Sequence, residues 1–488
     1  MSDETKSPSA DELSWTPLRL AVVAPLAGHN PARPAMPLRI AADDLDAAVE
    51  KVAPSLSIKI GGAPLSLEFR KRRDFDPKEV WAQAASQLTA GGALKGSPDD
   101  RSLRTPLLDA IVHHPDFAKL ESCWLGLAYL AKRGEAGQGR LVPLQLDALV
   151  TGIGEEWAER YRTQLFDPDY DNTSEVAASA LLIDQEFDHQ MASIERLHLL
   201  GELGAAIQTP VVASVGPAMF GLKNLAHLPS LPDLATKTFG GPWAGWNLFQ
   251  KENAARWVTL TVNRFLLRAP WGGGAADAFY NETVDPAHPE WLAFGSPIWA
   301  VGVSLAASYS QHGHCAAADG LAGTGGHRDL PTRELQQGPM TKVVVPTEVI
   351  LPDEKAWDLC RAGFTPLVGQ QNGDIAYFPF LGNSYRQAPG SVTLDQAMTY
   401  QLYAGQVSHR LLELSGRMPA GDPVEVCQWI EVQMFGELSP FVGETPGTHV
   451  SASPAQLPDG KIVAHVKITP TFKIQEKPLE FEVQLPLR

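Results

Sequence analysis

Hydrophobic residues recur along this chain with two periods, and the clearest helical pattern spans residues 111–130, IVHHPDFAKLESCWLGLAYL. Two histidines, a proline and an acid stand where this helix should begin, and an apolar stripe follows at spacings of three and four. The stripe consists of Phe117, Leu120, Trp124, Leu127 and Leu130. Because these side chains are large and apolar, we expect the helix to pack against a large surface rather than to expose reactive groups.

Short apolar runs predict buried strands between helices of this kind. Residues 18–24 (LRLAVVA) and 210–215 (PVVASV) are such runs, and the second is typical of a central strand covered on both faces. Further strands are expected at 139–148 and 177–182, and helices at 156–166, 191–207, 296–310, 394–414 and 423–435. This alternation predicts a mixed α/β (α+β) fold with a layered sheet and helices.

The first 90 residues have the pattern of a small α+β unit. A hairpin is expected at 57–60 and 65–69 around a Gly-Gly turn, with helices at 43–52 and 75–88. A segment rich in Gly, Ser and Asp follows. We therefore divide the chain into a flexible tail at 1–14, this unit at 15–90, a linker at 91–104 and a large domain at 105–488.

The end of the chain, residues 461–488, returns to strict alternation of apolar and polar positions, which predicts half-buried strands. Such strands either close a hairpin within their own sheet or pair with a neighbouring subunit. In the second case the early apolar run at 18–24 is a further candidate. The positions expected to take part in pairing between subunits are Leu18, Leu20, Val22, Ile462, Val466, Ile468, Leu479, Phe481, Val483 and Leu485.

Composition and charge narrow the class of protein. The 488 residues are 44% hydrophobic, enough for the cores of two or three domains. The formal net charge of −16 argues against a nucleic-acid partner, since phosphate contacts require a basic surface. No apolar run approaches the ~18 residues of a membrane span, and the polar N-terminus has no apolar signal core. The four cysteines are far apart without CxxC spacing, which fits a reducing cytoplasm.

Three segments hold residue types that occur in metal or phosphate sites. Residues 312–315 (HGHC) lack a second His/Cys pair at ligand spacing. Residues 184–189 (DQEFDH) place three acids on one side of an extended strand, suitable for a divalent cation, although such clusters are more often solvated strand ends. Residues 320–326 (GLAGTGG) lack the lysine of a phosphate-binding loop. With no GxSxG motif either, we expect no catalytic, metal-binding or cofactor-binding residues, and the chain is not predicted to be an enzyme.

From about residue 105 to the end, the chain resembles the large subunit of the type VI secretion contractile sheath. The block at 111–130 fits the family's ExxWxGL pattern, and further blocks stand at 210–231, 252–272 and 345–364. The last strands also resemble those of the family. The residues that carry the resemblance, and that we expect to serve packing and ion pairs within the fold, are Glu121, Trp124, Gly126, Leu127, Glu252, Arg256, Phe265, Arg268, Pro346, Glu348 and Phe364.

Residues 15–90 resemble the small subunit of the same sheath. The two subunits are usually separate polypeptides, so this chain resembles a fused, single-chain protomer. The fusion also shortens the helical region that precedes the HHPDF block in the family. That region includes the helix recognised by the AAA+ unfoldase that recycles contracted sheaths, so recycling by this partner stays in doubt.

The resemblance implies a structural protomer that assembles with itself, as hexameric rings stacked in a helical tube around an inner tube protein. Contraction of the tube on its baseplate would drive protein secretion or injection. A cytoplasmic bacterial assembly docked on an envelope-anchored baseplate is implied, with no nucleic acid, no cofactor and no direct membrane insertion. Two alternatives remain open: a non-contractile shell or baseplate component on the same fold and, less favoured, a metal-dependent enzyme.

Overall fold

The chain is described here by a computed structural model that covers residues 17–136, 144–171, 174, 176–232, 234, 240–273, 275, 278–285, 288–336, 341–386, 392–438, 448–458 and 460–487. The tail expected at 1–14 lies outside these described residues. Helices and strands alternate through the chain and enclose a central sheet, which confirms the mixed α/β class.

The central sheet has seven strands, of which six are parallel. The interior strand β1 (Leu18–Ala24) pairs with β5 (Leu144–Val150) on one side and β6 (Ala180–Phe187) on the other. Beyond β6 follow β7 (Val211–Val215), β8 (Val258–Val262) and β14 (Thr365–Pro366), and β2 (Leu38–Ile40) closes the other edge antiparallel to β5. Taken in chain order, the first five parallel strands lie as 2-1-3-4-5, so the order reverses between β1 and β6.

Helices cover both faces of this sheet. The side chains of β1 accordingly alternate between two apolar cores, one on each face. Leu18, Leu20 and Val22 face the core built with α4 (Pro115–Ala136) and α9 (Ile298–His312). Ala21 and Val23 face the core on the other side, which includes residues of α7 (Met191–Ala206) and α8 (Ala244–Phe249). All residues of β1, β7 and β8 are buried, as expected for strands covered on both faces.

The N-terminal unit follows the sequence pattern closely. β3 (Ser55–Ile60) and β4 (Ala63–Glu68) form the expected hairpin, and α1 (Leu45–Val52) and α2 (Pro77–Ala90) are the expected helices. The helix pattern at 111–130 begins at Pro115, where His114 Nδ1 accepts the N–H of Asp116. A second helix precedes it that was not expected, α3 (Arg101–Val112), which Asp100 caps.

Two expectations for the middle of the chain were wrong in detail. The helix expected at 156–166 is interrupted by a π turn between α5 (Ala158–Tyr161) and α6 (Asp167–Tyr170). The strand expected to end at residue 182 continues to Phe187 and carries the acids at 184 and 186 within it. The remaining elements are β9 (Phe265–Leu266), β10 (Phe294–Gly295), β11 (Gly326–His327), β12 (Arg333–Gln336), β13 (Lys342–Val345), α10 (Asp353–Arg361), β15 (Val368–Gly369) and β16 (Ala376–Tyr377).

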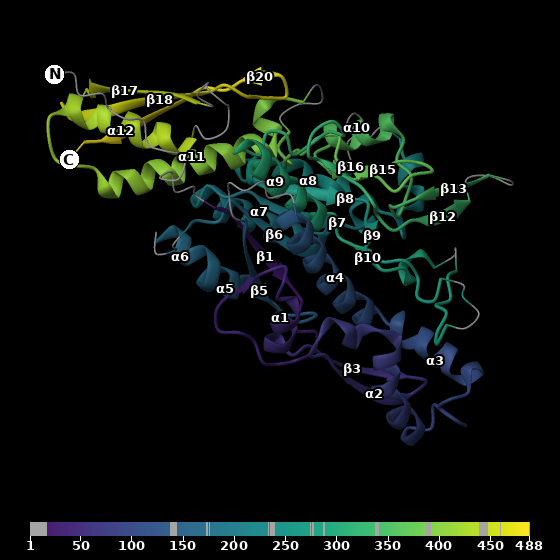
Figure 1. Cartoon of the computed structure of the whole chain (residues 1–488). Helices are drawn as coiled ribbons and strands as arrows, with labels where there is room; N and C mark the ends of the chain where they lie inside the picture. The colour runs from purple at the N-terminus through teal and green to yellow at the C-terminus, as the bar shows by residue number, and fades with distance from the viewer. Residues whose placement is uncertain are drawn as a thin grey trace.

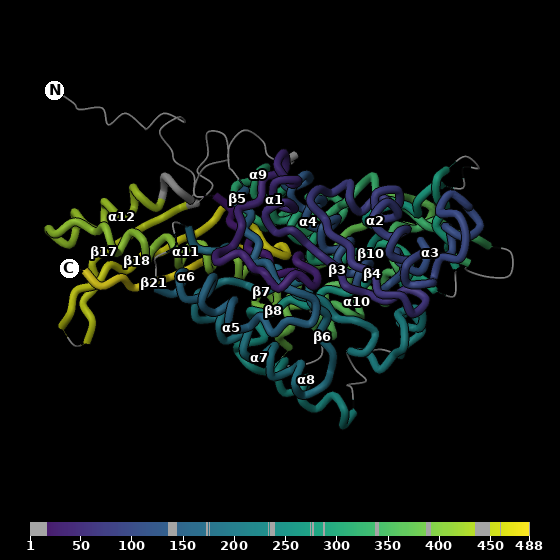
Figure 2. The backbone as a smooth tube through the Cα atoms, turned by 90° about the horizontal axis from the view of Figure 1, so that it is seen from below, coloured from purple at the N-terminus to yellow at the C-terminus, as the bar shows by residue number. Residues whose placement is uncertain are grey.

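The C-terminal elements form an arm that projects from the body of the molecule (Figures 1 and 2). The arm is defined here as α11 (Met398–Arg417), α12 (Pro423–Leu438) and the strands β17 (Thr448–Gln456), β18 (Ile462–Pro470) and β21 (Phe481–Pro486). The three strands form an antiparallel sheet in the order β17-β18-β21, so the two alternating segments pair with each other within the chain. A short hairpin of β19 (Lys473–Ile474) and β20 (Lys477–Pro478) connects β18 to β21.

Candidate functional site

Among the described residues, the arm sheet is covered on one face only. Ala464, Val466 and Ile468 of β18 are buried in a core of their own, together with residues of α11 and α12. On the opposite face, Lys467 lies 2.8 Å from Glu480 and 3.7 Å from Glu482 on the neighbouring strand, and all three side chains are exposed. The arm therefore presents a polar open face and two sheet edges.

Hydrogen bonding within the arm sheet decides which peptide groups point outward. In an antiparallel pair, successive residues alternate between facing the partner strand and facing away from it. The N–H of Leu487 donates to the carbonyl of Ile462 at 3.4 Å, so the odd-numbered residues of β21 face β18. The N–H and C=O groups of Glu482 and Gln484 consequently point out of the sheet, and no described strand pairs with that side of β21.

The structure places the sequence-predicted pairing residues in two different settings. Leu18, Leu20 and Val22 lie in β1, whose two edges are taken by β5 and β6. Ile462, Val466 and Ile468 lie in β18, the middle strand of the arm sheet. Leu479 is buried just before β21, and Phe481, Val483 and Leu485 lie in that edge strand. Of these groups, β21 is the strand whose outer side is open within the described part of the chain.

One contact between the arm and the body is made by the β19–β20 hairpin and the residue before it. The Phe472 ring stacks on His314, with ring centroids 3.7 Å apart, and Gln475 donates to Asp319 at 3.2 Å. Burial and, to a smaller extent, the neighbouring His312 together lower the pKa of His314 to about 4. Burial raises the pKa of Asp319 to about 6, against the N–H that Leu381 donates to it. The junction is thus built with a neutral histidine.

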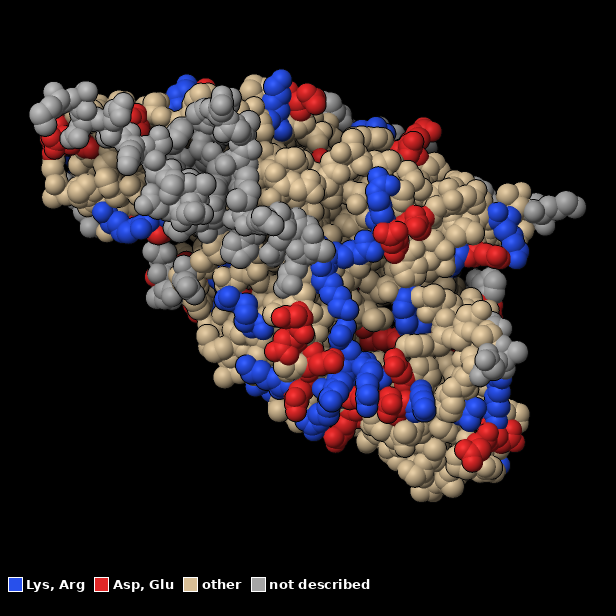
Figure 3. Space-filling model, in the orientation of Figure 1, with Lys and Arg blue, Asp and Glu red and all other residues tan. Residues whose placement is uncertain are grey.

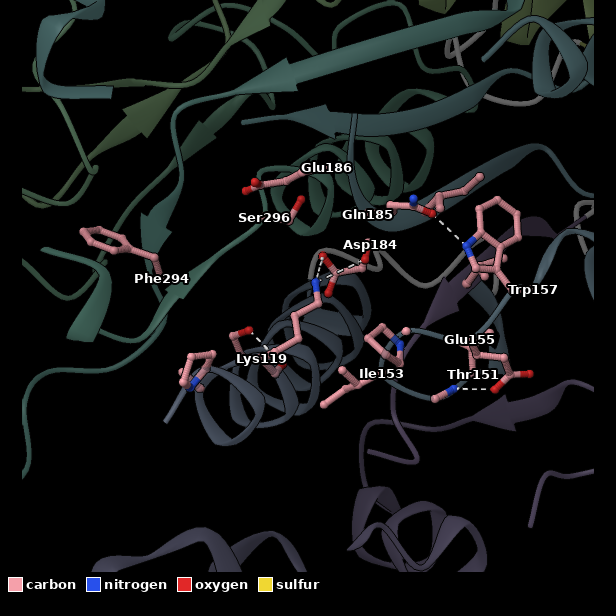
Figure 4. A pocket seen from close by; sticks show the side chains of 18 of the residues that line it. Lys119, Thr151, Ile153, Glu155, Trp157, Asp184, Gln185, Glu186, Phe294 and Ser296 are labelled. Atoms are coloured by element: carbon pink, nitrogen blue, oxygen red, sulfur yellow. Dashed lines mark hydrogen bonds and ion pairs between the residues drawn. The ribbon is translucent and has the colours of Figure 1, made fainter. Parts of the chain in front are cut away.

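A cavity of about 580 Å³ opens at the carboxyl ends of β1, β5 and β6, where the strand order reverses. Ligands of open α/β sheets bind at such reversal points, so the cavity is a second candidate site. Lys119 of α4 points across it to Asp184 of β6, with Nζ 3.1 Å from the carboxylate (Figure 4). Burial disfavours the charge of Lys119, but Asp184 outweighs it and raises the pKa.

The cationic side chains that line this cavity are already paired with acids. Lys119 pairs with Asp184, which also accepts the Cys123 thiol at 2.9 Å. Arg196 binds Glu156 with 2.8 and 2.9 Å contacts. Arg264 binds Glu348 in a two-pronged contact of 2.8 and 3.0 Å. These ion pairs hold the walls of the cavity in place. The three cations are neutralised by acids of the protein and are not available to bind an anion.

The acids at 184–189 do not form the cation site that alternation suggested. The register of β6 shifts between Leu182 and Glu186, so Asp184 is buried while Glu186 is exposed. Asp188 instead accepts the N–H of Gln190, the residue before α7, and His189 lies between these two residues after the end of the strand. In the described residues there is no group of three or more His, Cys, Asp or Glu side chains that could hold a metal ion.

The other two chemical candidates are parts of the packing. His314 stacks on Phe472, and its Nδ1 accepts the N–H of Ala316. In the loop 320–326, Cβ atoms at Gly323 and Gly325 would collide with the backbone of residues 317–319. The glycines are therefore needed for a close approach of two backbone segments.

The family-motif residues lie in the core and in ion pairs of the body. Arg268 grips Glu121 at 2.8 and 3.0 Å and Glu282 at 2.7 Å, and both carboxylates are almost completely buried. Burial disfavours the Arg268 charge, but the two carboxylates outweigh this effect and raise the pKa. Arg256 pairs with Asp395 at 3.2 Å.

The remaining motif residues pack or pair in the same way. Glu252 pairs with His198 at 2.7 Å. Trp124 is buried and donates to the carbonyl of Leu26, while Gly126 leaves room for the indole of Trp299. Leu127, Phe265 and Phe364 are fully buried, and the carbonyl of Pro346, two residues before the paired Glu348, accepts the N–H of Leu266.

Three important partners were missed by the sequence analysis: Glu282, Arg264 and Glu431. Glu282 lies 14 positions from its partner Arg268, and Arg264 lies 84 positions from its partner Glu348. Glu431 of α12 accepts the N–H of Ala452 in β17 at 2.7 Å. A charged residue at a position expected to be buried would have revealed such a partner. Burial at these positions is set by tertiary contacts, which a sequence pattern does not show.

On one face of the molecule, the surface charge is mixed rather than segregated. On the face seen in Figure 3, Lys and Arg side chains are interleaved with Asp and Glu. None of the helices in the described parts of the chain is both long enough and apolar enough to cross a membrane.

Comparison with known proteins adds independent information. Residues 100–384 match the VipB family model, described as the EvpB/VC_A0108 tail sheath N-terminal domain. A stretch of 299 residues is 27% identical to the type VI secretion system sheath protein TssC1 of Pseudomonas aeruginosa, covering 58% of this chain and 59% of that protein. One chain in the structure of the anti-feeding prophage (AFP) baseplate aligns over 100% of this chain and 94% of its own, with 8% identity and a TM-score of 0.39. That last likeness is too distant to support a functional argument.

Proposed function

This chain belongs to the VipB tail sheath family, and from that membership we propose that it is the structural protomer of a contractile sheath. The family consists of structural sheath proteins rather than enzymes. The observation that carries the proposal is the open edge of β21 on a projecting arm, because a polymer needs a surface that one copy leaves for another to complete.

The arm supplies a tie between copies that can survive movement of the bodies. An extended segment added to β21 meets the outward N–H and C=O groups of Glu482 and Gln484, about four hydrogen bonds worth roughly 1 kcal/mol each. Repeated around a ring, such ties hold copies together while the polar surfaces between bodies exchange partners. The energy of contraction is then held in the packing of the extended assembly, without a nucleotide site in the chain.

We also propose that residues 15–90 take the place of a separate small subunit. In support, β1 from this segment fills the position between β5 and β6 in the sheet of the large domain. Arg19 of β1 contacts Asp147 of β5 at 2.8 Å and Asp169 at 2.9 Å, and all three side chains are buried. A separate polypeptide in this position would require the same contacts.

The proposed assembly consists of rings of six copies, stacked into a tube around an inner tube protein and standing on an envelope-anchored baseplate in the bacterial cytoplasm. An AAA+ unfoldase is not included, because the fusion shortens the helical region before the HHPDF block that would bear its recognition helix. A static shell or baseplate component remains the rival function, and it differs from a sheath in that it does not contract.

Negative-stain electron microscopy of the purified full chain tests the proposal. We expect hollow tubes from the wild-type chain and none from Gln484→Pro, which removes one outward N–H from β21 but no hydrogen bond to β18. The matched control is Val450→Pro, at an outward position of β17, and it should still form tubes. Both variants should keep the wild-type melting temperature.

Three results would contradict the proposal or redirect it. Tubes from Gln484→Pro would show that β21 is not the joining edge. Monomers from the wild-type chain, even when co-expressed with its tube and baseplate partners, would contradict the sheath function. Tubes whose length and diameter stay fixed after release from the baseplate would favour the static shell.

A further inference from the structure

The second edge of the arm sheet, at β17, is closed by two side chains. The N–H of Leu457 donates to the carbonyl of Lys461 at 2.8 Å, so the even-numbered residues of β17 point away from β18. Pro454 is one of these outward residues and has no N–H to offer. The N–H of Ala452, the outward residue before it, is already bound by the carboxylate of Glu431 at 2.7 Å.

These two features remove the central donors of the edge. An incoming strand would meet outward positions at Val450, Ala452, Pro454 and Gln456, and the two in the middle cannot donate. A carboxylate beside the strand also repels the carbonyl oxygens of any chain that approaches. Prolines and charged groups on edge strands are known means of preventing sheet-to-sheet pairing.

The position of Glu431 makes this contact a specific one. Glu431 lies on α12, which packs along β17, and its side chain is half-buried against the strand. Glu425, six residues earlier on the same helix, is exposed, and no hydrogen bond or ion pair joins it to a strand residue among those described. The bond to Ala452 therefore does not follow merely from having acids on this helix.

We propose that Glu431 and Pro454 are specificity-determining residues that close β17 and confine strand addition to β21. This inference rests on the proposed function, because it presumes that copies join by adding a strand to the arm sheet. One accepting edge lets each arm take one strand from a neighbour. Two accepting edges would allow the sheet to continue from arm to arm, which is a route to aggregation.

The first test measures the contact itself, by amide hydrogen exchange in the full-length chain. In Glu431→Ala we expect the N–H of Ala452 to exchange about tenfold faster than in the wild type, since a hydrogen bond to a charged group is lost. Glu431→Gln retains an acceptor oxygen and should restore most of the protection. Glu425→Ala is the matched control and should leave Ala452 unchanged. An unchanged rate in Glu431→Ala would overturn the proposal.

The second test measures where neighbours attach, by photo-cross-linking from single introduced thiols that carry a benzophenone label, which needs no second thiol in the neighbouring chain. The four native cysteines are buried, so Ser453→Cys on β17 and Gln484→Cys on β21 give separate reporters. We expect cross-links between chains from Gln484→Cys and none from Ser453→Cys. After Glu431→Ala and Pro454→Ser are added, Ser453→Cys should cross-link as well, and sedimentation should show larger, irregular assemblies.

The outcomes separate this inference from the function on which it rests. Cross-linking of Ser453→Cys to the same extent with and without the added substitutions would overturn the role of Glu431 and Pro454 alone. Loss of Gln484→Cys cross-links in every background would instead overturn strand addition at β21. Exchange protection of Val466 in β18 checks that each variant is folded, and Pro454→Ser by itself provides a second way to open the edge should the double variant unfold.

Discussion

The central sheet and the arm sheet of this protein differ in how completely their strands are covered. In the central sheet, β1, β7 and β8 are buried at every residue, and both edges of each are paired within the chain. In the arm sheet, β21 alternates between exposed positions and positions that are partly or fully buried, and no described strand pairs with its outer edge. The difference teaches that the interior strands of the body find both partners within one copy, whereas the arm leaves an edge that, on the proposed function, another copy would complete.

The largest effect on stability is expected from removing a buried ion pair in the body. Arg268→Ala leaves Glu121 and Glu282 buried without their counter-charge, which should cost about 3–5 kcal/mol in the free energy of unfolding measured with urea. The control is Arg72→Ala, which removes an exposed pair with Asp46 and should cost no more than about 1 kcal/mol. Equal effects from the two variants would contradict the distinction between body and surface.

A second prediction compares glycines in the two regions and expects opposite signs. Gly126→Ala places a methyl group against the Trp299 indole where α4 crosses α9, and overpacking should cost about 1–3 kcal/mol. Gly416→Ala near the end of α11 meets no neighbouring atom and should stabilise the arm helix by up to about 1 kcal/mol. Thermal unfolding of the two variants would measure both, and destabilisation by Gly416→Ala would contradict the prediction.

The third prediction concerns the pH dependence of stability at the junction between the arm and the body. The pKa of His314 falls from its ordinary value of 6.5 to about 4 on folding, so between these values the unfolded chain binds more protons. The stability that neutral His314 contributes is full above pH 6.5 and is lost as the pH falls toward 4. Between pH 7 and pH 5, we expect the free energy of unfolding of the wild type to fall by about 1–2 kcal/mol more than that of His314→Gln.

Asp319 at the same junction changes the stability with pH in the opposite direction. Its effect cancels when the wild type is compared with His314→Gln. Its pKa is raised from 3.8 to about 6, so its contribution to stability declines as the pH rises through that interval. This effect is present both in the wild type and in His314→Gln. Urea unfolding at several pH values would measure the difference, and parallel curves for the two proteins would refute the role of His314.

The smallest effect is expected on the open face of the arm. Lys467 and its partners Glu480 and Glu482 are exposed, so their attraction is screened by water and salt. Lys467→Ala should leave the urea midpoint unchanged within experimental error. A clear loss of stability would mean that the open face is covered by something in the free protein.

The parts of the fold that could be predicted are those whose pattern depends on local contacts. Apolar runs identified β1 and β7, because a strand covered on both faces needs no polar positions. The sequence VTLTV of β8 was missed because Thr259 and Thr261 suggest an exposed side. In the fold both are buried, and Thr261 donates to the carbonyl of Ala213.

Helices and site residues show the same limit. The helix α3 was missed because it follows a segment rich in Gly, Ser and Asp and contains Pro106. The strand alternation at 461–485 identified the arm sheet, but it could not tell which edge is open. That depends on the contact of Glu431 with Ala452, 21 positions later, and on which way each peptide group of β17 points. Neither is encoded in a periodic pattern.

The place of β1 also fixes an order of events during synthesis. β1 leaves the ribosome well before β5, so Arg19 must wait for Asp147, 128 positions later, before its buried charge is matched. The body sheet can close only after β6 and β7 have been made, and the arm strands follow these body strands in the sequence. On the proposed function, the edge of β21 therefore becomes available only after the body strands behind it have been made, which protects the nascent chain from premature assembly.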